Sequence, residues 1–302
     1  MPQQYEGIHA ALATPFRPDD SVNEEVLAEL IDDLLENGVH GLVVNGSTGE
    51  GLLLGPDEWR RTAALAREKT RGHVPMTVQV GALTTRQAVD NARYAAEIGA
   101  DAVMLLPPFY EPLDDRELEA YVQAVAEVDL PIMIYNNPAA VGWSISPEQL
   151  ARLSLIDQVC YLKDTTSDAA RLFEVRRLIG DRLQLLNGQD SLAILGFLGG
   201  TRAGVWGAAN ATPRACVRLW ELTVDQPDLD AARRLWKALY PVMQFFEASG
   251  YVASVKAATE LRGIPVGAPR LPSLPLPDES RRQLSGLLAA LDEALQHQPA
   301  LS

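Results

Sequence analysis

Two cysteines and no long apolar run set the first limits on this 302-residue chain. Cys160 and Cys216 both lie among apolar residues, which is typical of a reducing compartment and not of a disulfide-stabilised secreted domain. No segment approaches the roughly 18 uninterrupted apolar residues of a membrane span, and the first residues lack the basic and apolar regions of a signal peptide. We therefore expect a globular protein of the cytoplasm with no membrane partner.

Positive charge is also limited. The chain has 26 lysine and arginine residues against 40 aspartate and glutamate residues, which gives a formal net charge of −14. This excess of negative charge argues against nucleic acid as a partner. The four histidines are scattered, and no expected strand end carries a cluster of histidine and carboxylate residues. We therefore expect neither a metal ion nor another cofactor.

Lysine is scarce, with only Lys69, Lys163, Lys237 and Lys256 in the chain. Arginine supplies most of the positive charge, so solubility does not explain Lys163 at the end of the apolar run 159–163. A low dielectric favours the neutral amine of a buried lysine, and a neutral amine can attack a carbonyl to form a Schiff base. Two structural alternatives stay open: the side chain could reach solvent from the strand end, or it could pair with Asp164.

Short apolar runs alternate with amphipathic segments along most of the chain. The runs lie at residues 8–13, 41–45, 76–80, 102–106, 131–135, 159–163, 183–187 and 203–206. Their continuous hydrophobicity is typical of parallel strands that are buried on both faces. Eight such units predict a (β/α)8 TIM barrel in the α/β class. A doubly wound open sheet is disfavoured, because no G-x-G-x-x-G turn follows the first run.

Helical patterns occupy residues 23–37, 56–71, 85–98 and 114–128. Residues 21–24 and 84–87 have the pattern of capping boxes, which places helix starts there. After about residue 226 the strands stop, and three helical segments follow at 228–249, 251–262 and 278–296. We therefore predict a catalytic barrel over residues 1–226 and a helical extension over 227–302.

Polar residues that could take part in catalysis or binding lie where predicted strands end, which is where TIM barrels carry their functional groups. Lys163 ends the sixth strand, and Tyr135 ends the fifth, where a phenol could move protons. Residues 45–51 follow the second strand, and their glycines and hydroxyls could form a cradle for a carboxylate. Taken singly, the tyrosine could equally belong to the core and the glycine-rich segment could be an ordinary polar turn.

Taken together, these segments match a known family. Gly46–Glu50, Tyr135-Asn136-x-Pro138 and Leu162–Asp164 occur in its order and spacing. The chain resembles, over essentially its whole length, the pyruvate-dependent class I aldolases of the dihydrodipicolinate synthase and N-acetylneuraminate lyase superfamily. The resemblance implies a barrel with a helical extension. It also implies that Lys163 forms a Schiff base with a 2-oxo acid and that Tyr135 shuttles protons.

The resemblance also implies how the substrate is held. Ser47 and Thr48, with Gly49 beside them, correspond to the residues that bind the carboxylate of the pyruvate-like substrate. Further candidates for substrate binding are Asn137, Gln189 and Ser191, whose side chains could hydrogen-bond substrate hydroxyls.

Other positions of the resemblance concern the far end of the substrate and the assembly. Gly188 and Asp190 match a loop that lines the site in the sugar-acid lyases. Tyr110 matches a tyrosine that in many members reaches into the site of a neighbouring subunit. The resemblance therefore implies a homotetramer or homodimer.

Two positions depart from the best-known members. Dihydrodipicolinate synthases carry an arginine two residues after the proline of the tyrosine motif, where it binds the carboxylate of aspartate semialdehyde, and this chain has Ala140. Sialic acid lyases follow the loop aspartate with a glutamate, where this chain has Ser191.

These departures decide the expected function. We expect a carbon–carbon or carbon–oxygen lyase that acts on a 2-oxo acid, with a 2-oxo-3-deoxy sugar acid that gives or uses pyruvate as the favoured substrate. The alternatives are the dihydrodipicolinate synthase of lysine biosynthesis and an inactive barrel with a binding or regulatory role.

Overall fold

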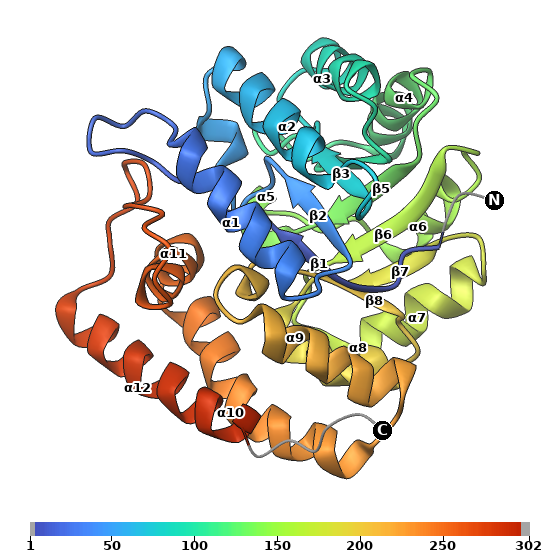
Figure 1. The fold of residues 1–302 in the computed structure, drawn as a ribbon. Helices are drawn as coiled ribbons and strands as arrows, with labels where there is room; N and C mark the ends of the chain where they lie inside the picture. The colour runs from blue at the N-terminus through green and yellow to red at the C-terminus, as the bar shows by residue number, and fades with distance from the viewer. Residues whose placement is uncertain (1–3, 297–302) are drawn as a thin grey trace.

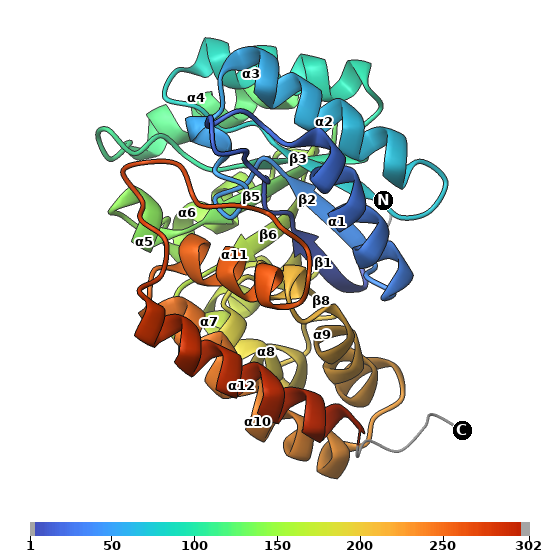
Figure 2. The ribbon, with the colours of Figure 1, turned by 60° about the vertical axis from the view of Figure 1, so that its left-hand side comes forward.

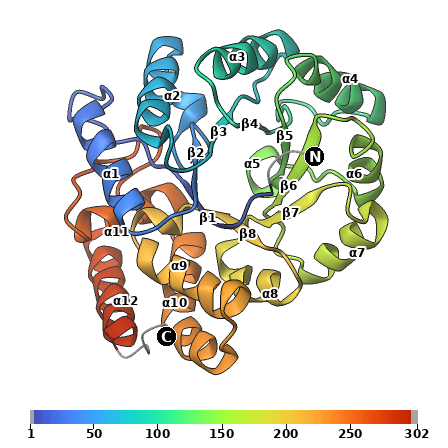
Figure 3. The same cartoon turned by 45° about the vertical axis from the view of Figure 1, so that its right-hand side comes forward.

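Eight parallel strands close into a barrel in which β1 pairs with both β2 and β8 (Figures 1 and 3). The computed structural model describes residues 4–296. The strands are β1 (Gly7–Ala11), β2 (Gly41–Val44), β3 (Met76–Gln79), β4 (Ala102–Leu105), β5 (Ile132–Asn136), β6 (Val159–Asp164), β7 (Gln184–Asn187) and β8 (Ala203–Trp206). Each predicted apolar run overlaps one strand, so the predicted TIM barrel is confirmed.

Helices surround the barrel and then continue beyond it (Figure 3). They are α1 (Glu24–Glu36), α2 (Pro56–Thr70), α3 (Thr85–Glu97), α4 (Asp115–Ala126), α5 (Pro138–Val141), α6 (Pro147–Leu153), α7 (Ala169–Ile179), α8 (Ala193–Leu198), α9 (Pro213–Trp220), α10 (Leu229–Ala248), α11 (Tyr251–Leu261) and α12 (Asp278–Gln296). The last three pack against one another. Residues 297–302 of the predicted extension lie outside the described residues. Within residues 4–296, no helix is long and apolar enough to cross a membrane.

The two predicted capping boxes have different outcomes. Thr84 caps α3, since its hydroxyl accepts a hydrogen bond from the Gln87 amide at 3.3 Å. The cap predicted at Ser21 is wrong, because its hydroxyl donates instead to an Asp19 carboxylate oxygen at 2.7 Å. Asn23 caps α1 in its place. An asparagine next to the first helical residue is as good an N-cap as serine, and here it stands at the correct position.

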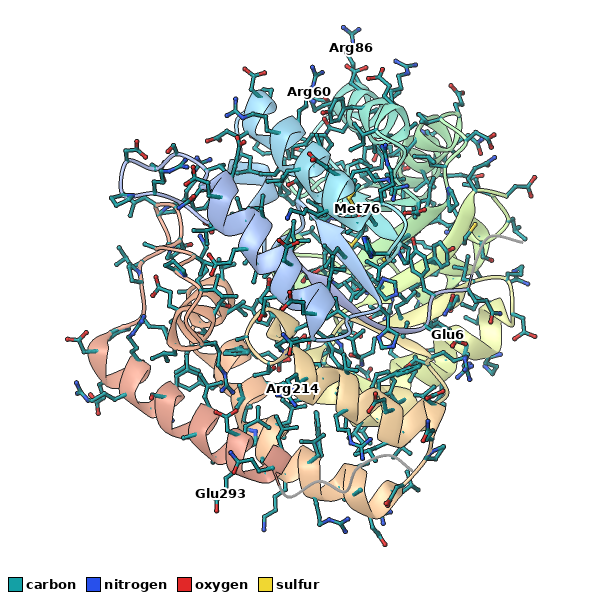
Figure 4. The ribbon with its side chains drawn as sticks, viewed as in Figure 1. Glu6, Arg60, Met76, Arg86, Arg214 and Glu293 are labelled. Atoms are coloured by element: carbon teal, nitrogen blue, oxygen red, sulfur yellow. The ribbon has the colours of Figure 1, made fainter. Side chains whose placement is uncertain are left out.

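The barrel has two apolar layers, which explains the continuous hydrophobicity of its strands. Met133 and Tyr135 of β5 belong to a cluster inside the barrel, whereas Ile132 and Ile134 belong to the cluster between strands and helices. This alternation follows from the two-residue period of a strand. Figure 4 shows Met76 enclosed in the molecule, while side chains project outward at Arg60, Arg86 and Glu293.

Candidate active site

Lys163 lies inside the barrel near the carboxyl end of β6. It follows inward-facing Tyr161 by two residues, so its side chain points to the same interior, and it is only 5% exposed. Its Cα atom is paired with that of Tyr135 on β5, and its Nζ atom lies 4.1 Å from the centroid of the Tyr135 ring. The alternative in which this lysine reaches solvent is therefore wrong.

Asp164, the next residue, is held by other partners. One of its oxygens accepts hydrogen bonds from the Arg171 Nε atom at 3.0 Å and from the Asn136 amide at 3.1 Å. The other accepts from the backbone N–H and the hydroxyl of Thr166. Within residues 4–296, Lys163 forms no salt bridge, and the carboxylate beside it is neutralised by Arg171. The alternative of a Lys163–Asp164 pair is wrong as well.

Tyr135 is 4% exposed, and Asn137 fixes the orientation of its phenol. The Asn137 side-chain N–H donates to the Tyr135 hydroxyl at 2.8 Å. The oxygen of the same amide accepts from the Ala140 backbone N–H at 3.3 Å and caps α5. Both polar groups of Asn137 thus have a partner, and each can make one further hydrogen bond, because the amide has two N–H donors and two acceptor lone pairs.

The segment after β2 is a tight turn whose backbone is packed against the barrel. A Cβ atom at Gly49 would lie 2.7 Å from the Leu12 carbonyl oxygen, so a side chain does not fit there. The Thr14 hydroxyl donates to the Gly49 carbonyl at 2.7 Å. Thr48 is 5% exposed, whereas Ser47 is exposed. The turn therefore presents one enclosed and one open hydroxyl at the carboxyl end of the strands.

The loop after β7 reaches the same place. A Cβ atom at Gly188 would lie 2.9 Å from Lys163 Cγ and 2.8 Å from the Asp164 carbonyl oxygen, so this loop can pass the lysine only because the position is glycine. Asp190 is 2% exposed, and it accepts hydrogen bonds from the Tyr251 hydroxyl at 2.5 Å and from the Ala208 amide at 3.2 Å. Burial raises the pKa of its carboxyl group to about 7.

Tyr251 was not found by sequence reasoning. It is the first residue of α11, and its hydroxyl accepts from the Gly207 amide at 2.9 Å while donating to Asp190. A Cβ atom at Gly207 would lie 2.9 Å from Thr48 Oγ1, so Gly207 separates Tyr251 from the turn after β2 by one backbone unit. Burial raises the pKa of Tyr251 well above its ordinary value. The sequence around Tyr251 contains no motif from which its contacts with Asp190 and Gly207 could have been predicted.

Comparison with known proteins places these features in a family. A sequence profile of the Dihydrodipicolinate synthetase family matches residues 4–291. A 4-hydroxy-tetrahydrodipicolinate synthase from Thermomicrobium roseum is 35% identical over 285 residues, which cover 94% of each chain. The chain belongs to the dihydrodipicolinate synthetase family. Members of this family are lyases.

Solved structures of the dihydrodipicolinate synthetase family have the same fold. A Pseudomonas aeruginosa protein of the dihydrodipicolinate synthetase type superposes with a TM-score of 0.92 at 35% identity, covering 95% of this chain and 100% of the other. A prophage protein of the dihydrodipicolinic acid synthase family from E. coli K12, solved in complex with pyruvate, gives a TM-score of 0.89 at 28% identity and covers 96% and 99%.

The residues expected to contact the far end of a substrate are not enclosed in the barrel interior as Lys163 and Tyr135 are. Ala140 is exposed in the short helix α5. The Ser191 backbone N–H donates to a Glu247 carboxylate oxygen at 2.9 Å. Gln189 lines a cavity between β6, β7 and the helices α7 and α8, which lies outside the barrel interior. Within residues 4–296, no group of three histidine, cysteine or acidic side chains is placed to hold a metal ion.

Tyr110 is separate from the other candidates of this family site. It lies in the loop between β4 and α4, and 86% of its surface is exposed. Loops after three adjacent strands carry further exposed apolar side chains, at Leu52, Leu53, Leu83 and Phe109. Scattered exposed leucines are common, but several on neighbouring loops at one end of a barrel are typical of an interaction surface.

Proposed function

We propose that the protein is a lyase that forms an imine between Lys163 and a 2-oxo acid and that it gives or uses pyruvate. The observation that carries this proposal is the enclosed Lys163 Nζ atom, which faces the Tyr135 ring at 4.1 Å and has no salt bridge within residues 4–296. A cation kept for solubility or for structure would be exposed or paired with a carboxylate.

The reaction begins when the neutral Lys163 amine attacks the carbonyl carbon of the 2-oxo acid. The adduct loses water and becomes a protonated imine. In carbon–carbon cleavage, the neighbouring hydroxyl loses its proton and an aldehyde leaves, while the imine accepts the electron pair of the broken bond and becomes an enamine that is then protonated on carbon. In carbon–oxygen cleavage, the imine accepts the electron pair of an adjacent carbon–hydrogen bond as its proton is removed, and the resulting enamine expels the hydroxyl group as water after protonation. Addition of water to the imine then releases the product and restores Lys163. In condensation, the enamine carbon attacks an aldehyde instead.

Tyr135 supplies and removes the protons of these steps, because its hydroxyl is on the strand next to Lys163 and is held by Asn137. The turn at residues 46–50 binds the carboxylate of the 2-oxo acid. The hydroxyls of Ser47 and Thr48 and backbone amides of the turn are suitable donors for an anion. Gly188 keeps the space beside the Lys163 side chain open.

The favoured substrate is a 2-oxo-3-deoxy sugar acid, because Ala140 offers no cation for a second carboxylate. The second candidate is 4-hydroxy-tetrahydrodipicolinate synthase activity. It is favoured by the name of the Thermomicrobium roseum relative, and on the evidence of relatives alone it is the stronger of the two. An inactive barrel is the weakest alternative, since both Lys163 and Tyr135 are present in the expected geometry.

The test is reduction with borohydride in the presence of pyruvate, followed by mass spectrometry of the peptide that contains Lys163. A stable adduct on Lys163 supports the imine, and no adduct at saturating pyruvate contradicts the proposal. Turnover of aspartate semialdehyde and of several 2-oxo-3-deoxy sugar acids then separates the two candidate substrates.

We further propose a homotetramer or homodimer in the cytoplasm, with residues 1–226 as the catalytic barrel and 227–302 as the extension. Tyr110 and the exposed apolar loops after β2, β3 and β4 support an interface at that end. Both cysteines are free, as a reducing compartment would leave them.

A further inference from the structure

Glu50, which ends the carboxylate turn 46–50, has an unfavourable backbone conformation. Its φ angle is 54°, in the left-handed region that non-glycine residues seldom adopt. Asn45, at the other end of the turn, has a φ angle of 58°. A Cβ atom at Gly51 would lie 1.8 Å from the Asn45 carbonyl oxygen, so the turn is closed tightly on itself. Conformations of this kind persist only where surrounding contacts enforce them.

Local hydrogen bonds, such as that from the Glu50 backbone N–H to the Ser47 carbonyl at 3.1 Å, hold part of the turn, and the contacts to the Glu50 carboxylate come from the far end of the sequence. One Glu50 carboxylate oxygen lies 2.8 Å from the Lys256 Nζ atom of α11. The other accepts a hydrogen bond at 2.7 Å from the backbone N–H of Arg270, which lies in the connector between α11 and α12. Glu50 is 6% exposed and Lys256 is 1% exposed, so solvent screens their attraction very little.

The other contacts of Lys256 are with an uncharged carbonyl and an aromatic ring. Its Nζ atom donates to the Ala268 carbonyl at 3.0 Å and lies 4.0 Å from the centroid of the Phe16 ring. The Arg270 guanidinium lies 4.4 Å from the same ring. The Phe16 backbone N–H also donates a hydrogen bond to the Val266 carbonyl of the connector at 3.0 Å. Figure 2 shows the connector running back from α11 toward the barrel segments that follow β1 and β2.

Arg270 extends this support past the turn. Its guanidinium forms two hydrogen bonds with the carboxylate of Glu58, at 2.8 and 2.6 Å, and one with the Leu53 carbonyl at 2.8 Å. Glu58 in turn accepts from the Gly55 backbone N–H and closes the start of α2. Residues 50–58 are therefore held between the barrel and the connector at both their ends.

We infer that Glu50 and Lys256 are positioning residues for substrate carboxylate binding: their buried ion pair holds the turn at residues 46–50 in the conformation that presents Ser47, Thr48 and the backbone amides. This inference rests on the proposed function. Lys256 does not touch the substrate; it acts through Glu50, which is two residues from Thr48. The helical extension is thereby a working part of the carboxylate site, although it supplies no group that reacts.

The competing explanation is that the pair only stabilises the fold. The two can be separated, because removal of one partner leaves a buried unpaired charge, whereas removal of both does not. In Lys256→Met, Glu50 loses its cation and thermal stability falls. In the double variant Glu50→Gln and Lys256→Met, no unpaired charge remains and much of that stability returns. The ion pair that holds the turn is absent from both variants.

The measured quantity is the pyruvate concentration that half-saturates borohydride trapping on Lys163. We expect it to rise on the order of 10-fold or more in Lys256→Met and to stay raised in the double variant, as for the loss of a charge-assisted contact to the carboxylate. The matched control is Lys69→Met, which removes the Lys69–Asp32 pair on the outer helices. That control should leave half-saturation unchanged.

The inference is overturned if the double variant recovers half-saturation together with stability, or if either variant traps pyruvate as readily as the unchanged protein. These outcomes leave the proposed function standing, because trapping on Lys163 still occurs. If the unchanged protein gives no adduct, the proposed function itself has failed. Glu50→Gln alone is a second test. It should raise the pyruvate concentration that half-saturates trapping, although Lys256 is still present.

Discussion

Lys163 and Tyr135 are direct neighbours across the β5–β6 pair, with the lysine Nζ atom 4.1 Å from the centroid of the tyrosine ring. The tyrosine hydroxyl is held from the side by Asn137. An amine and a phenol in this relationship can serve the same bound carbonyl compound, one as nucleophile and one as proton carrier.

Lys163→Ala should abolish turnover and borohydride trapping while the far-ultraviolet circular dichroism spectrum stays unchanged. The imine provides the electron sink for bond cleavage, and an alanine cannot form it. The unchanged spectrum shows that the variant is folded, so that the loss of activity can be assigned to the lysine. Lys237→Ala, outside the proposed site, is the matched control and should keep both activity and trapping. Trapping that persists in Lys163→Ala would place the imine elsewhere.

Tyr135→Phe should still be trapped with pyruvate, but its turnover number should fall on the order of 10²-fold or more, as for a lost acid–base group. The ring remains beside Lys163, so packing is preserved and the hydroxyl alone is removed. Steady-state and single-turnover kinetics measure the effect. An unchanged turnover number would show that another group moves the proton.

Replacement of Ala140 tests the choice of substrate. Activity with aspartate semialdehyde should be weak beside that with 2-oxo-3-deoxy sugar acids, and Ala140→Arg should raise it. The position is exposed, so solvent screening limits the expected gain in kcat/KM to about 5-fold, which corresponds to about 1 kcal/mol. Efficient condensation by the unchanged protein would instead favour the synthase named among its relatives.

Asp190→Asn should change how stability depends on pH. The pKa of this carboxyl is raised from 3.8 to about 7, so between these values the folded protein holds a proton that the unfolded chain releases. Its contribution to the free energy of unfolding is therefore fully present below pH 4 and is lost as the pH rises through 7. The full difference corresponds to roughly 4 kcal/mol.

The variant lacks this slope, so its stability relative to the unchanged protein should increase from pH 4 to pH 7 in urea titrations. Buried His9 has a pKa lowered to about 3 and gives a slope of opposite sign, but it is present in both proteins and cancels in the difference. Asp181→Asn, at an exposed position, is the control. A constant difference across the range would contradict the raised pKa.

Light scattering at micromolar concentration should give the mass of a dimer or tetramer. Tyr110→Asp should shift this mass toward the monomer, because a charge at an apolar contact is costly to bury. Tyr240→Asp, at another exposed tyrosine on α10, controls for the general effect of an added charge. A monomeric mass for the unchanged protein would refute the proposed assembly.

The barrel and the positions of Lys163 and Tyr135 at adjacent strand ends could be predicted because their signals are local. A strand buried on both faces is apolar throughout, and the residues at its end are known once the strand is known. The pairing of Asp164 could not be predicted, because its partner Arg171 lies in a helix whose rotation the sequence does not specify. Tyr251 and Lys256 were missed for a stronger reason: their partners Asp190 and Glu50 are far away in sequence, and no periodic pattern links them.

Arg270 donates its backbone N–H to Glu50 across 220 positions of the chain, and this separation has a consequence during synthesis. The barrel strands leave the ribosome well before the connector that holds Glu50, since chains grow at about 5–20 residues per second. A nascent chain can therefore close its barrel around Lys163 and still lack the contacts that hold the Glu50 carboxylate. We expect the protein to become active only after the connector that contains Arg270 has been made. A chain that ends before this connector would be partly folded but inactive.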